Sequence, residues 1–181
     1  MITGPFGPQD HGSCSVRAFD EVLSMSHFEE LSVWESPGAT IETLRAVGWL
    51  ERGWAYSKGE VTEPFFEALL NLLVRPWEPV AAAGPHACSQ CRFAGGPAQL
   101  TFGGTTITMG VSNVYVPGNA VIYVAPSLVA HYVDAHEYQP PKEFMEAVLQ
   151  CPPMRSMEYL RAIKSIGGSA LIGIGKSLRG P

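Results

Sequence analysis

The sequence has little positive charge and no long apolar run. Only 12 of its 181 residues are Lys or Arg, against 17 Asp and Glu, and the formal net charge is −5. A domain that binds nucleic acid or an anionic membrane normally carries a basic surface, so we expect neither kind of partner. The longest apolar run, residues 120–130, is shorter than the roughly 20 residues of a membrane-spanning helix. We also expect no secretory signal, because the first residues lack a basic segment followed by an apolar one.

Cysteines are few, and their spacing does not suggest a disulfide scaffold. The four are Cys14, Cys88, Cys91 and Cys151. Two form a C-x-x-C pair and two stand alone. Small secreted domains held together by disulfides instead contain many cysteines for their length, usually an even number that pair with one another. A chain of this length buries about 70% of its unfolded surface and needs no such framework. We therefore predict a reducing, cytoplasmic compartment.

Turn-forming residues divide the chain into short segments. The sequence contains 19 Gly and 15 Pro, without the period of a fibrous protein. Residues 1–15 are rich in Gly, Pro and Ser, and we predict them to be disordered. Residues 16–168 are expected to form a single domain. Residues 169–181 are apolar and Gly-rich without a clear period, and we predict a tail there.

Helix signals occur on both sides of the chain's middle. The clearest helix is residues 62–74, where Thr62 can cap, Pro64 lies in the first turn and an apolar stripe follows. It ends at Arg75 because the following Pro76 disfavours helical geometry in the residue before it. The other predicted helices span residues 16–32, 41–50, 126–136, 141–150 and 156–166.

The middle of the chain has the composition of short strands. They are expected at residues 80–83, 99–102, 105–109, 113–116 and 121–124, separated by glycine-containing turns. Strands in one block, rather than alternating with helices, favour an α+β fold. We predict N-terminal helices, a small central antiparallel sheet, and C-terminal helices packed on that sheet.

Four residues have the local spacings of a metal site. Cys88 and Cys91 form the C-x-x-C pair, and His131 and His136 form an H-x4-H pair that follows after 39 intervening residues. Two cysteines in a tight turn can direct both sulfurs at one tetrahedral ion. The pattern resembles the two-Cys, two-His zinc sites of many unrelated small domains. That resemblance implies a zinc-knuckle-like site with these four ligands, and it implies no activity.

Helix geometry and nearby residues leave alternatives open. Five residues along an ideal helix leave two side chains about 140° apart, so His131 and His136 can share an ion only if the helix ends or widens between them. His86 and Cys151 are competing ligands, and the choice between zinc and iron is open. The cysteines could also be ordinary buried thiols, and either histidine could have a purely structural role.

A structural zinc site is the expectation that fits the donor set best. Two thiolates weaken the Lewis acidity of the metal, and four protein ligands leave no position for water. We therefore expect a non-enzymatic protein that binds a protein partner or a second copy of itself, as an adaptor, regulator or immunity-type protein. The alternative is a small zinc-dependent hydrolase or deaminase, with Asp134, Glu137 or Glu143 as general base.

Other motifs carry weaker signals. Residues 170–177 approximate a phosphate-binding loop but have no following helix to meet a phosphate. His27 and Glu29, with the C-x-x-C pair, faintly resemble the signature of zinc deaminases. The four tryptophans are predicted to anchor the core, since large aromatic side chains dominate small cores; they are Trp34, Trp49, Trp54 and Trp77.

Overall fold

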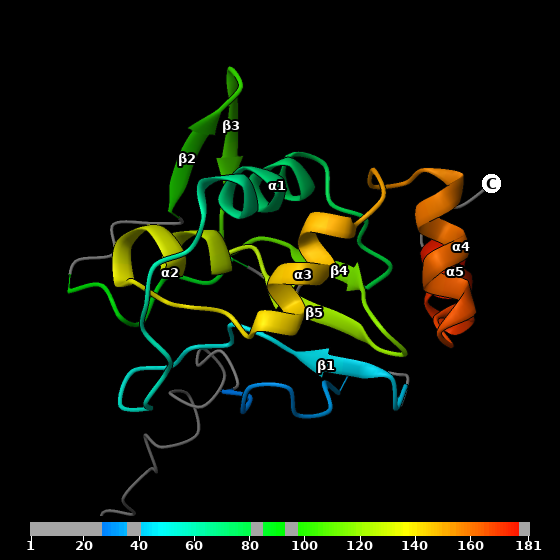
Figure 1. Ribbon diagram of the computed structural model, residues 1–181, viewed down its shortest axis with the longest axis horizontal. Helices are drawn as coiled ribbons and strands as arrows, with labels where there is room; N and C mark the ends of the chain where they lie inside the picture. The colour runs from blue at the N-terminus through cyan, green and yellow to red at the C-terminus, as the bar shows by residue number, and fades with distance from the viewer. Residues whose placement is uncertain (1–26, 36–40, 81–84, 93–97, 178–181) are drawn as a thin grey trace, which may run out of the picture.

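A hairpin of two apolar strands forms the centre of the fold. The computed structural model describes residues 27–35, 41–80, 85–92 and 98–177. Strand β4 (Asn113–Pro117) pairs antiparallel with β5 (Ile122–Pro126), as the sequence predicts (Figure 1). The Gly118 N–H donates to the Val121 carbonyl at 2.8 Å and closes the turn between them. Every residue of β5 is buried, because the strand has neighbours on both edges and helices nearby.

The second neighbour of β5 is a strand where the sequence predicted a helix. Residues Leu44–Ala46 form β1, which runs parallel to β5 with Leu44 opposite Ile122. The predicted helix at residues 41–50 is therefore wrong. Leu44 and Ala46 are fully buried and alternate with half-buried Arg45, the two-residue period of a strand. Pairing here also covers an apolar edge of β5 that would otherwise be open to other chains.

The predicted helix at residues 16–32 is also wrong over its described part. Residues 27–32 contain turns, and Leu31 has a positive φ of 62°. Main-chain bonds join Leu31 and Ser32 to Ala46, and Val33 forms an antiparallel bridge with Arg45. This segment thus lies along the outer edge of β1, whose hydrogen-bonding groups override the local helix preference. Residues 16–26 lie outside the described residues.

Four predicted helices are present close to their expected bounds. Helix α1 spans Glu63–Val74, α2 Val129–His136, α3 Lys142–Gln150 and α4 Met157–Ser165. The Ser156 side chain caps α4 by accepting from the Tyr159 N–H at 3.0 Å. Helix α3 contacts both α1 and β4, while α4 contacts β4 and α5 (Ser169–Ser177). Helix α2 lies at one end of the molecule and the α4–α5 pair at the other (Figure 1).

Helix α5 occupies a segment for which the sequence indicated no regular element. The glycines of this segment lower its helix propensity, so the sequence pattern did not indicate a helix here. Leu171 is fully buried and fixes this helix against the core. None of the helices within the described ranges is both long and apolar enough to cross a membrane.

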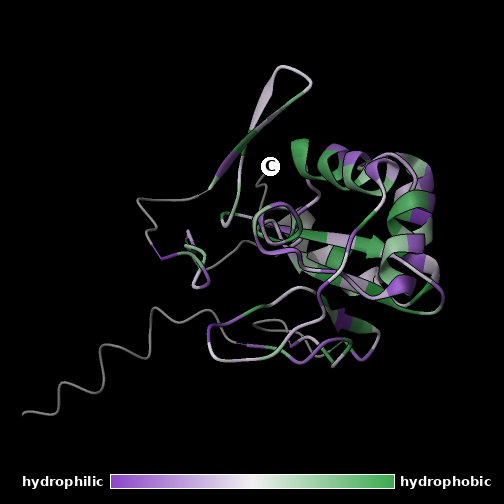
Figure 2. Ribbon diagram, turned by 60° about the vertical axis from the view of Figure 1, so that its left-hand side comes forward, coloured by the Kyte–Doolittle hydropathy of each residue, from purple (hydrophilic) through white to green (hydrophobic). Residues whose placement is uncertain are grey.

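The remaining two strands form a separate hairpin. Strands β2 (Gln99–Phe102) and β3 (Thr105–Thr108) pair antiparallel across the Gly103-Gly104 turn, as predicted. Both glycines have positive φ, which the turns of tight hairpins require. The hairpin projects from the body of the fold (Figure 1, Figure 2). The α+β class is thus confirmed, with a mixed sheet of order β1-β5-β4 and this two-stranded sheet in place of one antiparallel sheet. Of the predicted strand 80–83, Val80 lies in a bend and the rest is outside the described residues.

The core is rich in aromatic side chains. Trp34, Trp49 and Trp77 are buried, as expected, and Trp34 and Trp77 both pack edge-on against Tyr115. Trp54 does not belong to this core, because its side chain is 60% exposed. Packing in the core therefore does not explain why a tryptophan is found at this position.

One glycine joins the cysteine segment to the sheet. The His86 N–H donates to the Gly110 carbonyl at 2.7 Å. Gly110 has φ +78°, and a Cβ at this position would lie 2.0 Å from the His86 carbonyl oxygen. This close approach of two backbones admits only glycine.

We predict that Gly110→Ala lowers the free energy of unfolding by about 3 kcal/mol, because a left-handed strain of roughly 1–2 kcal/mol adds to a backbone displacement. Urea denaturation measures the loss. Gly103→Ala is the matched control, since Gly103 has φ +54° with nothing within 4 Å of the added Cβ. The control should lose only about 1 kcal/mol. Equal losses in the two variants would show that the contact with His86 is unimportant.

Candidate metal centre

The C-x-x-C motif lies in an irregular loop, residues 85–92. Cys88 is buried, with 6% of its surface exposed, and Cys91 is half-buried. The backbone N–H groups of Gln90 and Cys91 hydrogen-bond to the Cys88 sulfur and favour its thiolate form. Amides directed at sulfur in this way stabilise the charged form that metals bind.

The two histidines come from helix α2, and the end of this helix explains how they meet. Glu137 caps the helix in the left-handed conformation, with φ 56°. The N–H groups of Glu137 and Tyr138 both donate to the Tyr132 carbonyl. These bonds span five and six residues, so the last turn is wider than an α-helical turn. The widening brings His131 and His136 to one side of the helix, with ring centroids 5.0 Å apart.

The loop and the helix bring the four predicted ligands to one point. The Cys88 sulfur lies 3.3 Å from the His136 Nε2 atom, and the Cys91 sulfur lies 3.2 Å from the His131 Nε2 atom. One donor atom from each residue lies within 4.8 Å of every other. A tetrahedral zinc ion with ordinary bond lengths would separate sulfur from nitrogen by about 3.6 Å. The observed gaps are close to the edges of such a tetrahedron, so the group could hold a metal ion.

Burial keeps several of these groups neutral. It raises the pKa of Cys88 to about 11, and neighbouring Cys91 adds to the rise. Burial also lowers the pKa of His131 and His136, and the charge of the other imidazole lowers that of His131 further. Neutral imidazole is the form that coordinates a metal, and a thiol gives up its proton when it does so. The two imidazoles are therefore in the form that binds a cation, whereas the Cys88 thiol has to lose its proton on binding.

A third segment, residues 50–59, supports the cysteine loop. The Arg52 guanidinium donates to the Cys91 carbonyl at 2.8 Å, and the Arg52 N–H donates to the Ser89 hydroxyl at 3.1 Å. Sequence reasoning missed both contacts. The residues that make them lie 37 and 39 positions apart, and no spacing rule connects an arginine to a distant carbonyl.

The same segment also holds the end of helix α2. The Tyr56 hydroxyl donates to the His136 carbonyl at 3.4 Å, and the Gly59 N–H donates to the Glu137 carbonyl at 3.0 Å. Residues 50–59 thus run along both halves of the candidate centre. They hold the loop and the helix in the same relative position that a bound ion would require.

The competing ligands lie elsewhere. The group that could hold an ion contains neither His86 nor Cys151, and it is the one such group among the residues that the structure describes. The Cys151 thiol lies against the Pro152 carbonyl beyond α3, and burial raises its pKa to about 12. His86 uses its backbone to hold the loop to Gly110. Cys14 lies outside the described residues.

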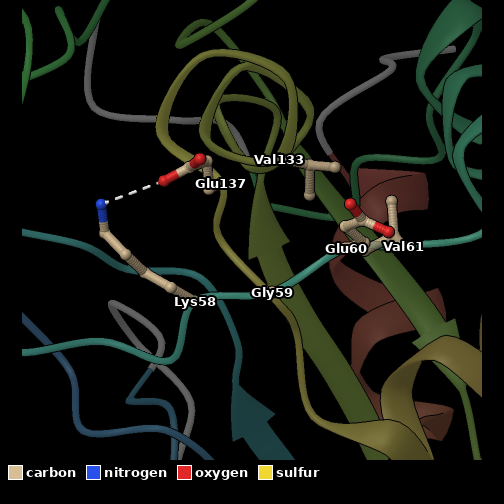
Figure 3. Close-up of a pocket in the computed structure, with 6 residues that line it drawn as sticks. All are labelled: Lys58, Gly59, Glu60, Val61, Val133 and Glu137. Atoms are coloured by element: carbon tan, nitrogen blue, oxygen red, sulfur yellow. Dashed lines mark hydrogen bonds and ion pairs between the residues drawn. The ribbon is translucent and has the colours of Figure 1, made fainter.

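The candidate general bases are not part of the group either. Asp134 lies on α2 and Glu137 caps this helix, but both are outside the four-residue group. Glu137 forms an exposed ion pair with Lys58, its carboxylate 3.4 Å from the ammonium. Figure 3 shows this pair at a pocket of about 480 Å³, which Val133 and Glu60 also line. None of the four donors lines that pocket. Glu143 lies in the first turn of helix α3 and lines a different pocket.

The two weaker motifs are not assembled into sites. Residues 170–177 lie inside helix α5, whereas a phosphate-binding loop must precede its helix. The His27 ring donates from Nδ1 to the Trp49 carbonyl at 3.1 Å and stacks on Trp54. It does not join the cysteines in the donor group, so the deaminase-like arrangement is not formed.

Comparison with known families places the chain in one of them. The model of the family described as "Domain of unknown function (DUF7919)" matches residues 26–149, and the chain belongs to this family. The matched region contains the cysteine loop, the supporting segment and helix α2. No curated protein and no solved structure matches the chain.

We predict that the purified chain carries about one metal ion, and that Cys88→Ser and His131→Ala each reduce this content at least tenfold, since a lost donor leaves an incomplete tetrahedron. Elemental analysis of protein prepared without chelator measures the content. His86→Ala and Cys151→Ser are the matched controls and should retain the ion. Loss of metal in a control, with retention in Cys88→Ser, would reassign the ligands.

Proposed function

We propose that Cys88, Cys91, His131 and His136 bind one zinc ion in a structural role, and that the chain acts by binding another protein. The observation that carries the proposal is the convergence of four protein donors on one point. The partner is either a different protein or a second copy of this chain, as for an adaptor, regulator or immunity-type protein. A reducing compartment such as the cytoplasm fits this assignment, since Cys88, Cys91 and Cys151 are free thiols.

The donor types support zinc. Two thiolates and two imidazoles at tetrahedral spacing are a standard zinc ligand set, and iron–sulfur clusters are usually held by four cysteines. The same four donors support a structural rather than a catalytic ion. Together they fill a tetrahedral shell, whereas catalytic zinc sites use three protein ligands and keep one position for water.

The location of the centre supports a stabilising effect. It joins the irregular loop of residues 85–92 to helix α2, two segments about 40 residues apart in the chain. A bond between distant segments restricts the unfolded chain as well as fixing the folded one. The loop has little regular structure of its own, so the ion would supply much of what holds it.

The surface supports binding of a protein. Large apolar side chains that are not among the four donors are exposed on the 50–57 segment and on helices α3 and α4: Trp54, Leu149 and Met157. An exposed tryptophan is unusual on a surface without a partner and common at the centre of interfaces. The formal charge of −5 favours a basic partner over nucleic acid or an anionic membrane.

We predict that removal of the metal destabilises the fold as a whole. Zinc present at a thousandfold excess over its dissociation constant adds about 4 kcal/mol to the free energy of unfolding. Chelation should therefore shift the urea midpoint of the zinc-loaded chain strongly downward. The double variant Cys88→Ser, Cys91→Ser should start at the lower midpoint and show no response to chelator. A chain that loses zinc and keeps its midpoint would favour the zinc-dependent hydrolase or deaminase.

A further inference from the structure

A pocket of about 740 Å³ lies between residues 27–30 and the 50–57 segment. Four of its lining residues have aromatic rings and two have carboxylates: His27, Phe28, Trp54, Tyr56, Glu29 and Glu30. Rings beside acidic groups are the combination that recognises organic cations, because the ring faces and the carboxylates both attract positive charge. Phe28 and Tyr56 also pack against the core, but the core does not account for the exposed Trp54 ring or the two carboxylates beside it.

The aromatic wall is held in place although it lies at the surface. The Trp54 ring stacks on the His27 ring, with centroids 4.3 Å apart and planes inclined by 17°. A bond to the Trp49 carbonyl fixes the His27 ring, and Phe28 packs edge-on against Trp49. Trp54 nevertheless leaves 60% of its surface exposed. A rigid and exposed indole is therefore available to a planar group from outside.

The carboxylate of Glu30 supplies negative charge from within. Its Oε1 atom accepts from the Tyr138 hydroxyl at 2.6 Å and from the Gly48 N–H at 3.1 Å. Its Oε2 atom is buried and has no hydrogen-bond partner among the described residues. A buried carboxylate oxygen without a donor is unfavourable, and burial accordingly raises the pKa of Glu30. A cation in the pocket would offset part of this cost by attraction to the Glu30 charge rather than by a bond to the buried Oε2 atom, and Glu29 adds a second, exposed carboxylate.

We propose that this pocket binds an arginine side chain of a protein partner, with the guanidinium stacked on Trp54 and its charge directed toward Glu29 and Glu30. The inference rests on the proposed function, because it names the group by which a protein partner is recognised. Arginine suits the site better than lysine because its planar guanidinium stacks on rings and can pair with a carboxylate through two parallel bonds.

Hydrogen bonds of the 50–57 segment join the pocket to the metal centre. The segment that carries Trp54 is fastened at Arg52 to the cysteine loop and at Tyr56 to the end of α2. The Tyr132 hydroxyl, from the same helix, donates to the Leu50 carbonyl at 3.5 Å. An ion that fixes the loop and the helix therefore also fixes the wall of the pocket. The structural metal would thus prepare a recognition surface beside it.

The test uses the zinc-loaded full chain and two small probes, N-acetylarginine N-methylamide and its citrulline counterpart, which is neutral and has the same shape. Nuclear magnetic resonance of the tryptophan indole N–H groups reports binding. The arginine probe should shift the Trp54 signal with a millimolar dissociation constant and bind about tenfold more tightly than the citrulline probe. Equal binding of the two probes, or no shift with either, would overturn the proposal.

Matched variants separate the pocket from general effects on the fold. Trp54→Ala should weaken the arginine probe about tenfold and Glu30→Gln a few-fold. Met157→Ala removes another exposed apolar side chain, and Glu158→Gln removes another carboxylate, both on the distant helix α4. Neither control should change binding. Weakening by a control equal to that of its pocket variant would contradict the assignment.

Failure of this inference is distinguishable from failure of the proposed function. Trp54→Ala should retain zinc while it weakens the arginine probe about tenfold, because it removes the pocket wall and leaves the four donors and the supporting contacts of Arg52 and Tyr56 intact. A chain that binds zinc but not the arginine probe would support the metal assignment and contradict arginine binding in the pocket. A chain that binds the arginine probe but carries no zinc would support the pocket and contradict the metal assignment.

Discussion

The placing of two sulfur and two nitrogen donors around one point is the constraint on which this structure depends. Without an ion these groups contact one another through weak sulfur–nitrogen hydrogen bonds of 3.2–3.4 Å, and burial disfavours the thiolate of Cys88 and the protonated rings of His131 and His136. A cation changes this balance, because it draws a proton from each thiol and accepts a lone pair from each ring. The loop geometry, the widened end of α2 and the Arg52 contacts are all consistent with that single requirement. None of these features is needed for burial of the sheet.

The two halves of the fold are stabilised by different forces. The sheet and helices α1, α3 and α4 bury a continuous set of aromatic and aliphatic side chains, so the hydrophobic effect holds them. The cysteine loop and residues 50–59 bury much less and depend on hydrogen bonds to main-chain carbonyls. Structure that a small core cannot fix is where a bound ion contributes most. The exposed Trp54 and the pocket beside it lie in this second half, where a rigid surface has to be built without a core.

Sequence patterns predicted the elements whose causes are local. The apolar stripe of α1 with Pro64 and Pro76, and the glycine-containing turn between β2 and β3, each act within a few residues, and these elements were found close to their expected bounds. Strand β1 was missed because its partner β5 is far away in the chain and only the pairing makes residues 44–46 extended. The four donor residues were chosen from the C-x-x-C and H-x4-H spacings. These spacings are local, so they can be recognised without knowing how the fold brings the two pairs together. Arg52 and the aromatic pocket have no such spacing and become visible only in three dimensions.

The coordination shell of the proposed zinc ion is the most direct measure of the central claim. X-ray absorption spectroscopy at the zinc edge, on protein purified without chelator, reports the type and distance of each ligand. The account predicts two sulfurs at about 2.3 Å and two nitrogens at about 2.0–2.1 Å, with four ligands in all. A shell with one sulfur, or with a water in place of an imidazole, would contradict a closed structural site. A chain without metal, with all four side chains intact, would contradict the account entirely.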